Sequence, residues 1–244
     1  GMCGTLVMLS TQSIAAGVVA CLVVGTLCGI INGALVAKVK MAPFIVTLAM
    51  QGAAASITKI VAGGNSQTIT LTAFRAFNRG EIIPGVRNYI LYMVIIVLLM
   101  YFLLRKTVLG RWIYATGSNE EASRLVGIPV DRVKIICYTI SGFLSSVAAL
   151  LGASRLMTVE VTAGVGMELD AIAATCIGGA SLSGGMGTAF GALIGTLLQT
   201  GINNGINLLR INSFWSGAVT GLVIIVSVYV GMAAGKNKKR KGKR

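Results

Sequence analysis

The sequence predicts an all-α, polytopic membrane protein. Hydrophobic residues make up 55% of the 244 residues and charged residues only 11%, whereas soluble domains carry roughly 25% charged residues. The mean hydropathy is +0.84. Glycine is abundant, with 32 residues, and glycine in apolar helices lets neighbouring backbones approach closely. These observations predict a tightly packed bundle of about seven membrane-spanning helices.

The apolar runs can be placed in order, because a helix needs about 20 residues to cross a hydrocarbon core. The first run, 12–37, ends at Lys38 and Lys40. The second begins at Pro43, a residue that the first turn of a helix tolerates. A loop containing glycine, asparagine and arginine follows at 64–88. The predicted spans are 12–37, 43–63, 89–104, 133–153, 169–182, 188–208 and 214–234.

The run at 169–182 leaves two alternatives open. A stretch of about 10–14 apolar residues is more typical of a re-entrant or buried segment than of a span. Basic residues, however, concentrate in cytoplasmic loops. A crossing here puts most of them inside, with the C-terminus cytoplasmic and the N-terminus outside, so we expect the segment to cross. The residues then inside are those of the tail and Lys38, Lys40, Arg105, Lys106, Arg111, Arg124, Arg132 and Lys134.

The most charged interior segment lies at 115–128, between two long apolar runs. Glu120, Glu121 and Arg124 fall within about one helical turn. Ser118 or Asn119 can cap the first free backbone N–H groups, and the glutamates favour the positive end of the helix. A short amphipathic helix should form. It is either a solvated connection between two spans or a docking surface for a partner.

The chain resembles the ribose, xylose and arabinose type of ABC sugar permease. The resemblance runs from about 17 to 230 and is densest in the charged loop and at 168–207. It implies that the loop at 105–134 is the cytoplasmic coupling loop that fits a groove on the ATPase subunit. The residues expected to couple to that subunit are Gly117, Asn119, Glu120, Glu121, Ala122, Arg124 and Gly127.

The resemblance also implies the rest of the assembly. A permease domain at 1–235, in the bacterial cytoplasmic (inner) membrane, would be followed by a polybasic cytoplasmic tail at 236–244. The implied partners are an ABC ATPase subunit that binds the ATP, a second identical or related permease, and an extracytoplasmic sugar-binding protein. The tail suits anionic lipid headgroups. Nucleic acid is the weaker alternative, because the tail lacks interleaved aromatic residues.

An internal echo supports an inverted-repeat fold. Gly25-Thr26-Leu27, followed by Asn32 and Gly33, is answered by Gly195-Thr196-Leu197, followed by Asn204 and Gly205. In the predicted topology the two copies run in opposite directions, as in many transporters. The unmatched spans then predict about ten helices in the complete fold, with about three preceding residue 1. Chance similarity between two glycine-rich spans is the alternative.

Three glycine patterns have structural interpretations. Gly25, Gly29 and Gly33 form one GxxxG ladder, and Gly187, Gly191 and Gly195 form another, so each predicts a bare helix face for packing. The segment Leu182-Ser183-Gly184-Gly185 mimics the signature of ABC ATPases. No GxxxxGK[ST] phosphate loop accompanies it. We interpret it as a helix-breaking turn.

The polar residues decide between classes of function. No carboxylate is expected at mid-span, which disfavours an ion-coupled carrier, and no constellation of nucleophile, base and oxyanion donors indicates a membrane-embedded enzyme. Glu168 and Asp170 are outer-face entrance candidates, or simply favourable charges at a helix start. No catalytic residue, cofactor or metal site is expected, since the five cysteines are scattered and histidine is absent. A monosaccharide pathway would use Asn32, Gln51, Ser141, Gln199, Asn203 and Asn204.

Overall fold

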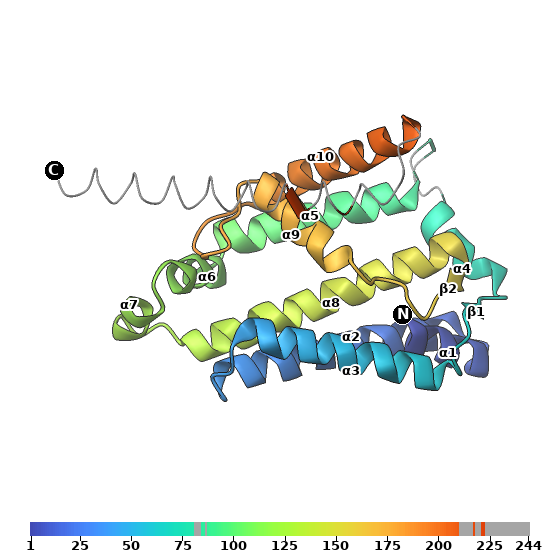
Figure 1. Cartoon of the computed structure of the whole chain (residues 1–244), viewed down its shortest axis with the longest axis horizontal. Coiled ribbons are helices and arrows are strands. Elements are labelled where there is room, and N and C mark those ends of the chain that lie inside the picture. Colours follow the sequence, from blue (N-terminus) through green and yellow to red (C-terminus); the bar gives the residue numbers. More distant parts are fainter. Residues whose placement is uncertain (81–83, 86, 210–216, 218–220, 223–244) are drawn as a thin grey trace. The chain divides into compact units, whose positions relative to one another are not determined.

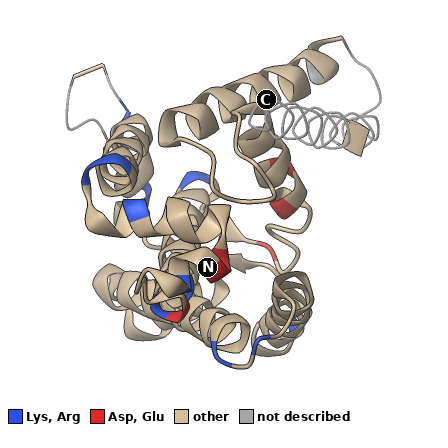
Figure 2. Cartoon of the chain, turned by 90° about the vertical axis from the view of Figure 1, so that its left-hand side faces the viewer, with Lys and Arg blue, Asp and Glu red and all other residues tan. Residues whose placement is uncertain are grey.

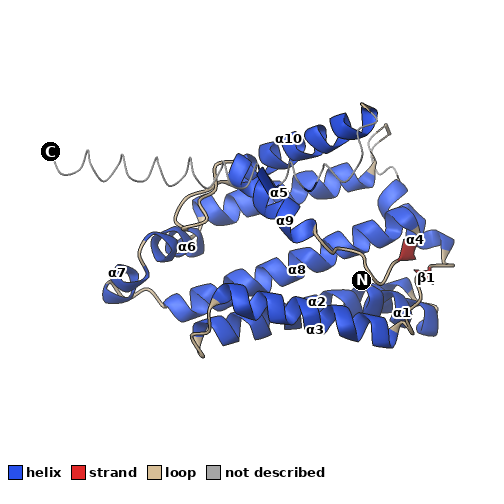
Figure 3. Cartoon of the chain, viewed as in Figure 1, coloured by secondary structure: helices blue, strands red, loops and turns tan. Residues whose placement is uncertain are grey.

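The computed structural model describes residues 1–80, 84–85, 87–209, 217 and 221–222. These residues are mostly helical, with two very short strands (Figures 1 and 3). They fall into two compact units. Unit 1 is formed by Gly1–Ile95 and Pro129–Ala163, and unit 2 by Ile96–Ile128 and the described residues from Gly164 onward.

Unit 1 is built around two long helices, α2 and α8. α2 begins after Ser13, whose hydroxyl accepts a hydrogen bond from the Ala16 N–H, and α8 ends at Met157, which has a left-handed backbone. The short helix α1 precedes α2, and α3 follows it. The elements of unit 1 are α1 (Met2–Thr11), α2 (Ile14–Ala37), α3 (Pro43–Val61), β1 (Gln67–Thr68), α4 (Thr72–Arg79), the start of α5 (Asn88–Lys106), α8 (Val130–Leu156) and β2 (Thr158–Val159).

The glycine ladder of α2 packs against α8, as predicted. A Cβ on Gly33 would lie 2.8 Å from the Cα of Ile135, and one on Gly29 would overlap the Tyr138 carbonyl. Gly25 likewise lies against Gly142 and Ser146. Because side chains are absent at these positions, the two backbones approach closely along several turns. The ladder is therefore a packing device.

One end of unit 1 holds an apolar core that the sequence did not predict. Phe74 of α4 and Met8 of α1 are each only 1% exposed, and they join a cluster with Cys21, Leu150 and others. The Ser154 hydroxyl donates to the Phe74 carbonyl (2.7 Å), and the Asn78 amide donates to the Leu151 carbonyl (2.7 Å). The predicted loop at 64–88 therefore contains α4 and β1, which pairs antiparallel with β2.

Unit 2 contains the remaining part of α5 and four further helices. The α5 residue Tyr101 contacts Phe190 edge-on, with ring centroids 5.0 Å apart. The other elements are α6 (Val108–Ser118), α7 (Glu120–Leu125), α9 (Met167–Ile177) and α10 (Ala189–Leu208). α9 and α10 form an antiparallel pair, joined by a turn at 178–187 that contains the Leu182-Ser183-Gly184-Gly185 segment.

The α9–α10 pair packs backbone against backbone. A Cβ on Gly195 would overlap the Ala174 carbonyl, and Gly178 and Gly191 each face the carbonyl of the other. The second ladder is thus also a packing face, except that Gly187 lies in the turn and not on the helix, with φ at +148°.

The predicted span at 169–182 is corrected by α9. The helix has 11 residues, which at 1.5 Å per residue is about 16 Å, against a hydrocarbon core of about 30 Å. It stops because Gly178 and Gly179 follow. Gly179 has φ at +84°, and the N–H groups of Gly179 and Ala180 close back onto Cys176 and Thr175, which is a Schellman stop.

The first and last predicted spans also differ from what the structure describes. The first predicted span, 12–37, begins at Ile14, and the separate helix α1 before it was missed. Among the described residues, α2, α3, α5 and α8 are long and apolar enough to cross a membrane. α10 has 20 residues but carries Gln199, Asn203 and Asn204. The predicted span at 214–234 lies almost entirely outside the described residues, as does the tail.

Charged residues are sparse along the ribbon (Figure 2). Large apolar side chains are exposed on the long helices instead, including Phe44 at 72% and Ile60 at 78% on α3. Apolar surface of this extent is typical of helices that face lipid. The structure is therefore that of an α-helical, multi-pass membrane protein, as the composition predicted.

Candidate docking loop and polar pathway residues

The charged loop forms the predicted short helix, α7. Asn119 is its N-cap, with the side-chain oxygen accepting a hydrogen bond from the Ala122 N–H at 3.0 Å. Asn119 also has the extended backbone that an N-cap requires (φ −159°, ψ 109°). The Ser123 hydroxyl donates to the Asn119 carbonyl at 2.8 Å. The cap therefore fixes where the helix starts.

Gly127 fixes where α7 ends. Its φ is +83°, a conformation that glycine adopts without steric cost. The Gly127 N–H donates to the Arg124 carbonyl at 3.1 Å, and the Ile128 N–H donates to the Ser123 carbonyl at 3.0 Å. This pair of hydrogen bonds is a Schellman motif. Both ends of this six-residue helix are thus set by specific residues.

The charges of α7 complement the helix dipole. Glu120 and Glu121 lie in the first turn and Arg124 in the last, where each sign is favoured. Arg124 and Glu120 form an ion pair at 3.2 Å, with side chains 42% and 41% exposed. An exposed pair of this spacing contributes only about 0.3–0.5 kcal/mol. Stability alone is therefore a weak reason for these charges.

Two exposed apolar side chains at the end of α7 were missed by the sequence reasoning. Leu125 is 88% exposed and Val126 is 76% exposed. They lie in a charged loop where water would favour polar residues. An exposed apolar side chain on a helix with fixed ends can become buried when a partner protein binds. Their position beside Arg124 in the most charged segment was the available signal.

The helix α6, which leads into α7, contacts the turn between α9 and α10. The Tyr114 hydroxyl donates to the Gly187 carbonyl at 2.7 Å. A Cβ on Gly117 would lie 2.5 Å from the Gly185 nitrogen. Gly117 therefore has a packing role here. In Figure 1 the turn lies beside α6.

The predicted pathway residues divide between the two units. Asn32, on α2, has a side-chain oxygen that is buried without a hydrogen-bond partner. Gln51, on α3, and Ser141, on α8, are exposed, and the Ser141 carbonyl accepts from Ser145 at 2.8 Å. These three belong to unit 1. Gln199, Asn203 and Asn204 belong to unit 2, so whether the six line one pathway stays a prediction.

In unit 2 the α9–α10 pair brings two of the predicted residues together. The Gln199 amide donates to Asp170 Oδ1 at 3.4 Å, and Gln199 is only 4% exposed. Asn203 is half-buried and Asn204 exposed, one helical turn further along α10. Glu168 is exposed at the start of α9. Asp170 therefore does more than favour the helix start, because it is tied to the neighbouring helix.

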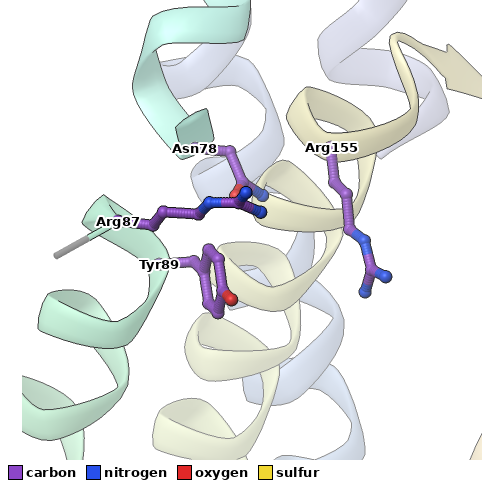
Figure 4. Close-up of a pocket in the computed structure, with 4 residues that line it drawn as sticks. All are labelled: Asn78, Arg87, Tyr89 and Arg155. Carbon is purple, nitrogen blue, oxygen red and sulfur yellow. The ribbon is translucent and has the colours of Figure 1, made fainter. Parts of the chain in front are cut away.

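A small cavity of about 230 Å³ lies in unit 1, where α4, the start of α5 and the end of α8 meet. Its lining residues are Asn78, Arg87, Tyr89 and Arg155. Figure 4 shows the Arg87 side chain extending toward Asn78, with Arg155 coming from α8. The cavity lies at the end of unit 1 that carries the loop predicted at 64–88. Within the described residues, no group of three His, Cys, Asp or Glu side chains could hold a metal ion.

The fold and the capped loop define a class of protein, a polytopic α-helical membrane protein with a short, rigid surface helix between two of its spans. Comparison with known proteins specifies the class further. The model of the family "Branched-chain amino acid transport system / permease component" matches residues 1–228. The chain belongs to this family.

Individual relatives agree with the family. A probable ABC transporter permease protein, y4mJ of Sinorhizobium fredii, is 46% identical over 228 residues, covering 91% of this chain and 68% of the relative. The ribose import permease protein RbsC of Bacillus subtilis is 44% identical over 199 residues, covering 81% and 62%. The L-arabinose ABC transporter permease protein AraH of Azospirillum brasilense is 31% identical over 228 residues, covering 93% and 67%.

The chain thus spans about two thirds of the length of the curated relatives that it matches. No solved structure matches it.

Proposed function

We propose that the chain is a membrane-spanning permease subunit of a binding-protein-dependent ABC importer that brings a monosaccharide into the bacterial cytoplasm. ATP would be bound and hydrolysed by a separate subunit. The observation that carries the proposal is the family membership together with the capped helix α7. The similarity to ribose and arabinose permeases supports a pentose or a related small polar solute.

The geometry of α7 supports its role as the docking surface for the ATPase subunit. The helix is held at both ends by Asn119 and Gly127, so it can present a fixed surface. That surface combines Leu125 and Val126 with an exposed ion pair. Apolar anchors surrounded by charges are the usual composition of a protein interface.

Connectivity supports a topology in which the docking loop and the 178–187 turn lie on the same side of the membrane, which we propose is the cytoplasmic side. α8 starts at Val130, shortly after α7, and its 27 residues reach the other side of a membrane. The turn at 178–187 contacts α6, next to the docking loop. The chain would therefore return between 157 and 177, with α9 as its helical part.

The irregular stretch before α9 fits a transport pathway. In a membrane, backbone outside regular helices is tolerated where it is buried in protein or lines a polar cavity. Interrupted helices are also common beside transporter substrate sites. Asp170, in the first turn of α9 directly after this stretch, bonds to the buried Gln199 of α10. We propose that these residues, with Asn203, contact the sugar or the pathway that it follows.

The remaining partners follow from the same proposal. A second copy, or a related permease, would complete the pathway. A sugar-binding protein would dock on the outer face, where the cavity with Arg87 and Arg155 offers two cations to carboxylates of a partner. The C-terminal tail would lie in the cytoplasm, against anionic lipid headgroups.

The experiment that tests the proposal is uptake of radiolabelled D-ribose by vesicles. These would contain the permease together with an ABC ATPase subunit and a sugar-binding protein that co-purify with it. The expected result is ATP-dependent accumulation, and the double variant Glu120→Ala/Arg124→Ala should insert normally and lose most uptake. Since the ion pair contributes so little stability, a large loss indicates a lost docking contact. Uptake without the ATPase, or driven by an ion gradient alone, would contradict the proposal.

The control variant is Glu168→Ala, which changes an acidic residue outside α7. Glu168→Ala removes an exposed carboxylate from α9, at a distance from α7 along the chain. It should leave the ATPase bound to the membrane, whereas the docking variant should release it. Equal ATPase binding by both variants would contradict the role of α7.

A further inference from the structure

The turn at 178–187 is held in a defined shape by its own backbone. The Ser181 N–H donates to the Met186 carbonyl at 3.1 Å, and the Gly184 N–H donates to the Ser181 carbonyl at 3.0 Å. Gly184 and Gly185 have φ values of +89° and +74°, which favour glycine. The turn is therefore a folded unit that can transmit a displacement.

The turn fits closely against α6. Gly184 faces the Gly117 carbonyl, with 2.6 Å to a Cβ built on Gly184, and Gly185 faces Ser118. The Tyr114 hydroxyl ties α6 to Gly187 at 2.7 Å. Tyr114, Gly117 and Ser118, which lie within about one turn of α6, contact this segment. Asn119, the cap of α7, follows directly after Ser118.

The turn continues directly into the closely packed α9–α10 pair. Gly178 and Gly191 each face the carbonyl of the other, and Gly195 faces the Ala174 carbonyl. The Gln199–Asp170 hydrogen bond lies further along the same interface. Close-packed backbones have little room to deform independently. Movement of the turn should therefore move both helices together.

We propose that the 178–187 turn transmits movement of the docking loop to the α9–α10 pair, with Tyr114 and Gly117 as the positioning residues that hold the turn on α6. The link rests on the proposed function, because it needs a partner at α7 to move the loop. It gives the glycines of the turn a mechanical role in addition to ending α9. It also connects the ATPase surface to Asp170 and Gln199 through contacts within one compact unit.

The test is amide hydrogen exchange of the full-length permease, measured with and without its ATPase subunit and compared with the variant Tyr114→Phe. Tyr114→Phe removes one hydroxyl and keeps the ring. Without the ATPase, the amides of 181–186 should exchange about five-fold faster in the variant, the effect of one ordinary hydrogen bond. With the ATPase, both 119–127 and 181–186 should be protected in the wild type. In the variant only 119–127 should be.

Tyr101→Phe is the matched control. It removes the hydroxyl that accepts from Arg105 at 3.3 Å on α5, makes no change at the turn, and should exchange like the wild type. Gly117→Ala is the second variant, since its Cβ would overlap the Gly185 nitrogen. It should open the turn more than Tyr114→Phe does.

A transport measurement distinguishes transmission of movement through the turn from a purely stabilising role of Tyr114. In vesicles with D-ribose, Tyr114→Phe should raise the number of ATP molecules hydrolysed per ribose imported. Loss of folded protein would instead lower the rates of ATP hydrolysis and of ribose import in parallel and leave this ratio unchanged. Unchanged exchange at 181–186, or an unchanged ratio, would overturn the link while leaving the proposed function intact. A docking loop that the ATPase does not protect would overturn the proposed function, and the link with it.

Discussion

Two helix pairs in the molecule share one architecture and differ in how they are held. In unit 1 the short helix α1 packs antiparallel on the long helix α2, and in unit 2 the short helix α9 packs on the long helix α10. The first pair has glycine contacts, in which Gly4 and Gly17 each face the carbonyl of the other, and is also fixed by side chains of an apolar core that includes Met8 and Phe74. The second is fixed by backbone contacts at glycines and by a polar pair, Gln199 and Asp170.

Because of this difference, only one of the two pairs is suited to move. Large interlocked side chains resist sliding, because any shift opens cavities. Among the described residues, that apolar core does not extend to α9 or α10, so this pair can shift as one body, and its polar pair can exchange partners. The second pair is also the one joined to α6 and thus to the docking loop. We therefore expect the α1–α2 pair to be a support and the α9–α10 pair to be the responsive part.

The largest expected effect is on the core of unit 1. Phe74→Ala removes a ring that is 1% exposed, and such changes cost about 3–5 kcal/mol. Thermal unfolding in detergent should show a strong loss of stability, while the ATP hydrolysed per ribose imported by the surviving protein stays at the wild-type ratio. Phe102→Ala, at a 62% exposed position on α5, should unfold like the wild type. A changed ratio in Phe74→Ala would make this region part of the coupling.

The second effect is on the α9–α10 interface. Gly195→Ala places a Cβ on the Ala174 carbonyl and 2.8 Å from the Gly178 nitrogen, and overpacking of this kind costs about 1–3 kcal/mol. Ribose uptake should fall several-fold more than the amount of folded protein. Gly205→Ala, on the same helix with open space around it, should transport normally. Similar uptake by the two variants would remove the distinction between the helix pairs.

The third effect is at the end of α7, the proposed docking helix. Gly127→Ala forces a side chain into a left-handed conformation at φ +83°, which costs about 1–2 kcal/mol. Binding of the ATPase to permease-containing membranes should weaken roughly ten-fold, since α7 is no longer held in one orientation. Gly152→Ala, in a helix and with open space around it, is the control. Normal ATPase binding by Gly127→Ala would show that the orientation of α7 is unimportant.

The smallest effect is at the start of the same helix. Asn119→Ala removes the cap on the Ala122 N–H, at a cost of about 1 kcal/mol, and Asn119→Ser should restore most of it. The measurement is again ATPase binding, where a loss of about five-fold is expected. An equal loss in the serine variant would indicate that Asn119 itself contacts the ATPase and is more than a cap.

Local chemistry was enough to predict much of this structure. The capping residue Asn119, the acidic first turn of α7, the α2 glycine ladder and most span positions depend on neighbours a few residues apart. Composition alone separated a membrane protein from a soluble one. For the same reason, the helix-breaking turn at Ser183, Gly184 and Gly185 could be predicted from the sequence, although the end of α9 was placed several residues too late.

What the sequence did not reveal depends on distant partners. The Tyr114 hydroxyl and the Gly187 carbonyl are 73 residues apart, and α4 is stabilised by contacts of Phe74 and Asn78 with α8. No local pattern specifies such pairs. The exposure of Leu125 and Val126 was also missed, because an apolar residue in a short loop helix is usually buried, although their position in the most charged segment was a signal.

We propose that the exposed end of α7 is the surface on which the ATPase subunit docks. The most direct measurement is photo-crosslinking, with a benzophenone amino acid in place of Leu125 in the full-length permease and, as control, in place of Ile60 on α3, which is also highly exposed at 78%. We predict a crosslink to the ATPase from position 125 and none from position 60. A crosslink from position 60 without one from position 125 would contradict the claim.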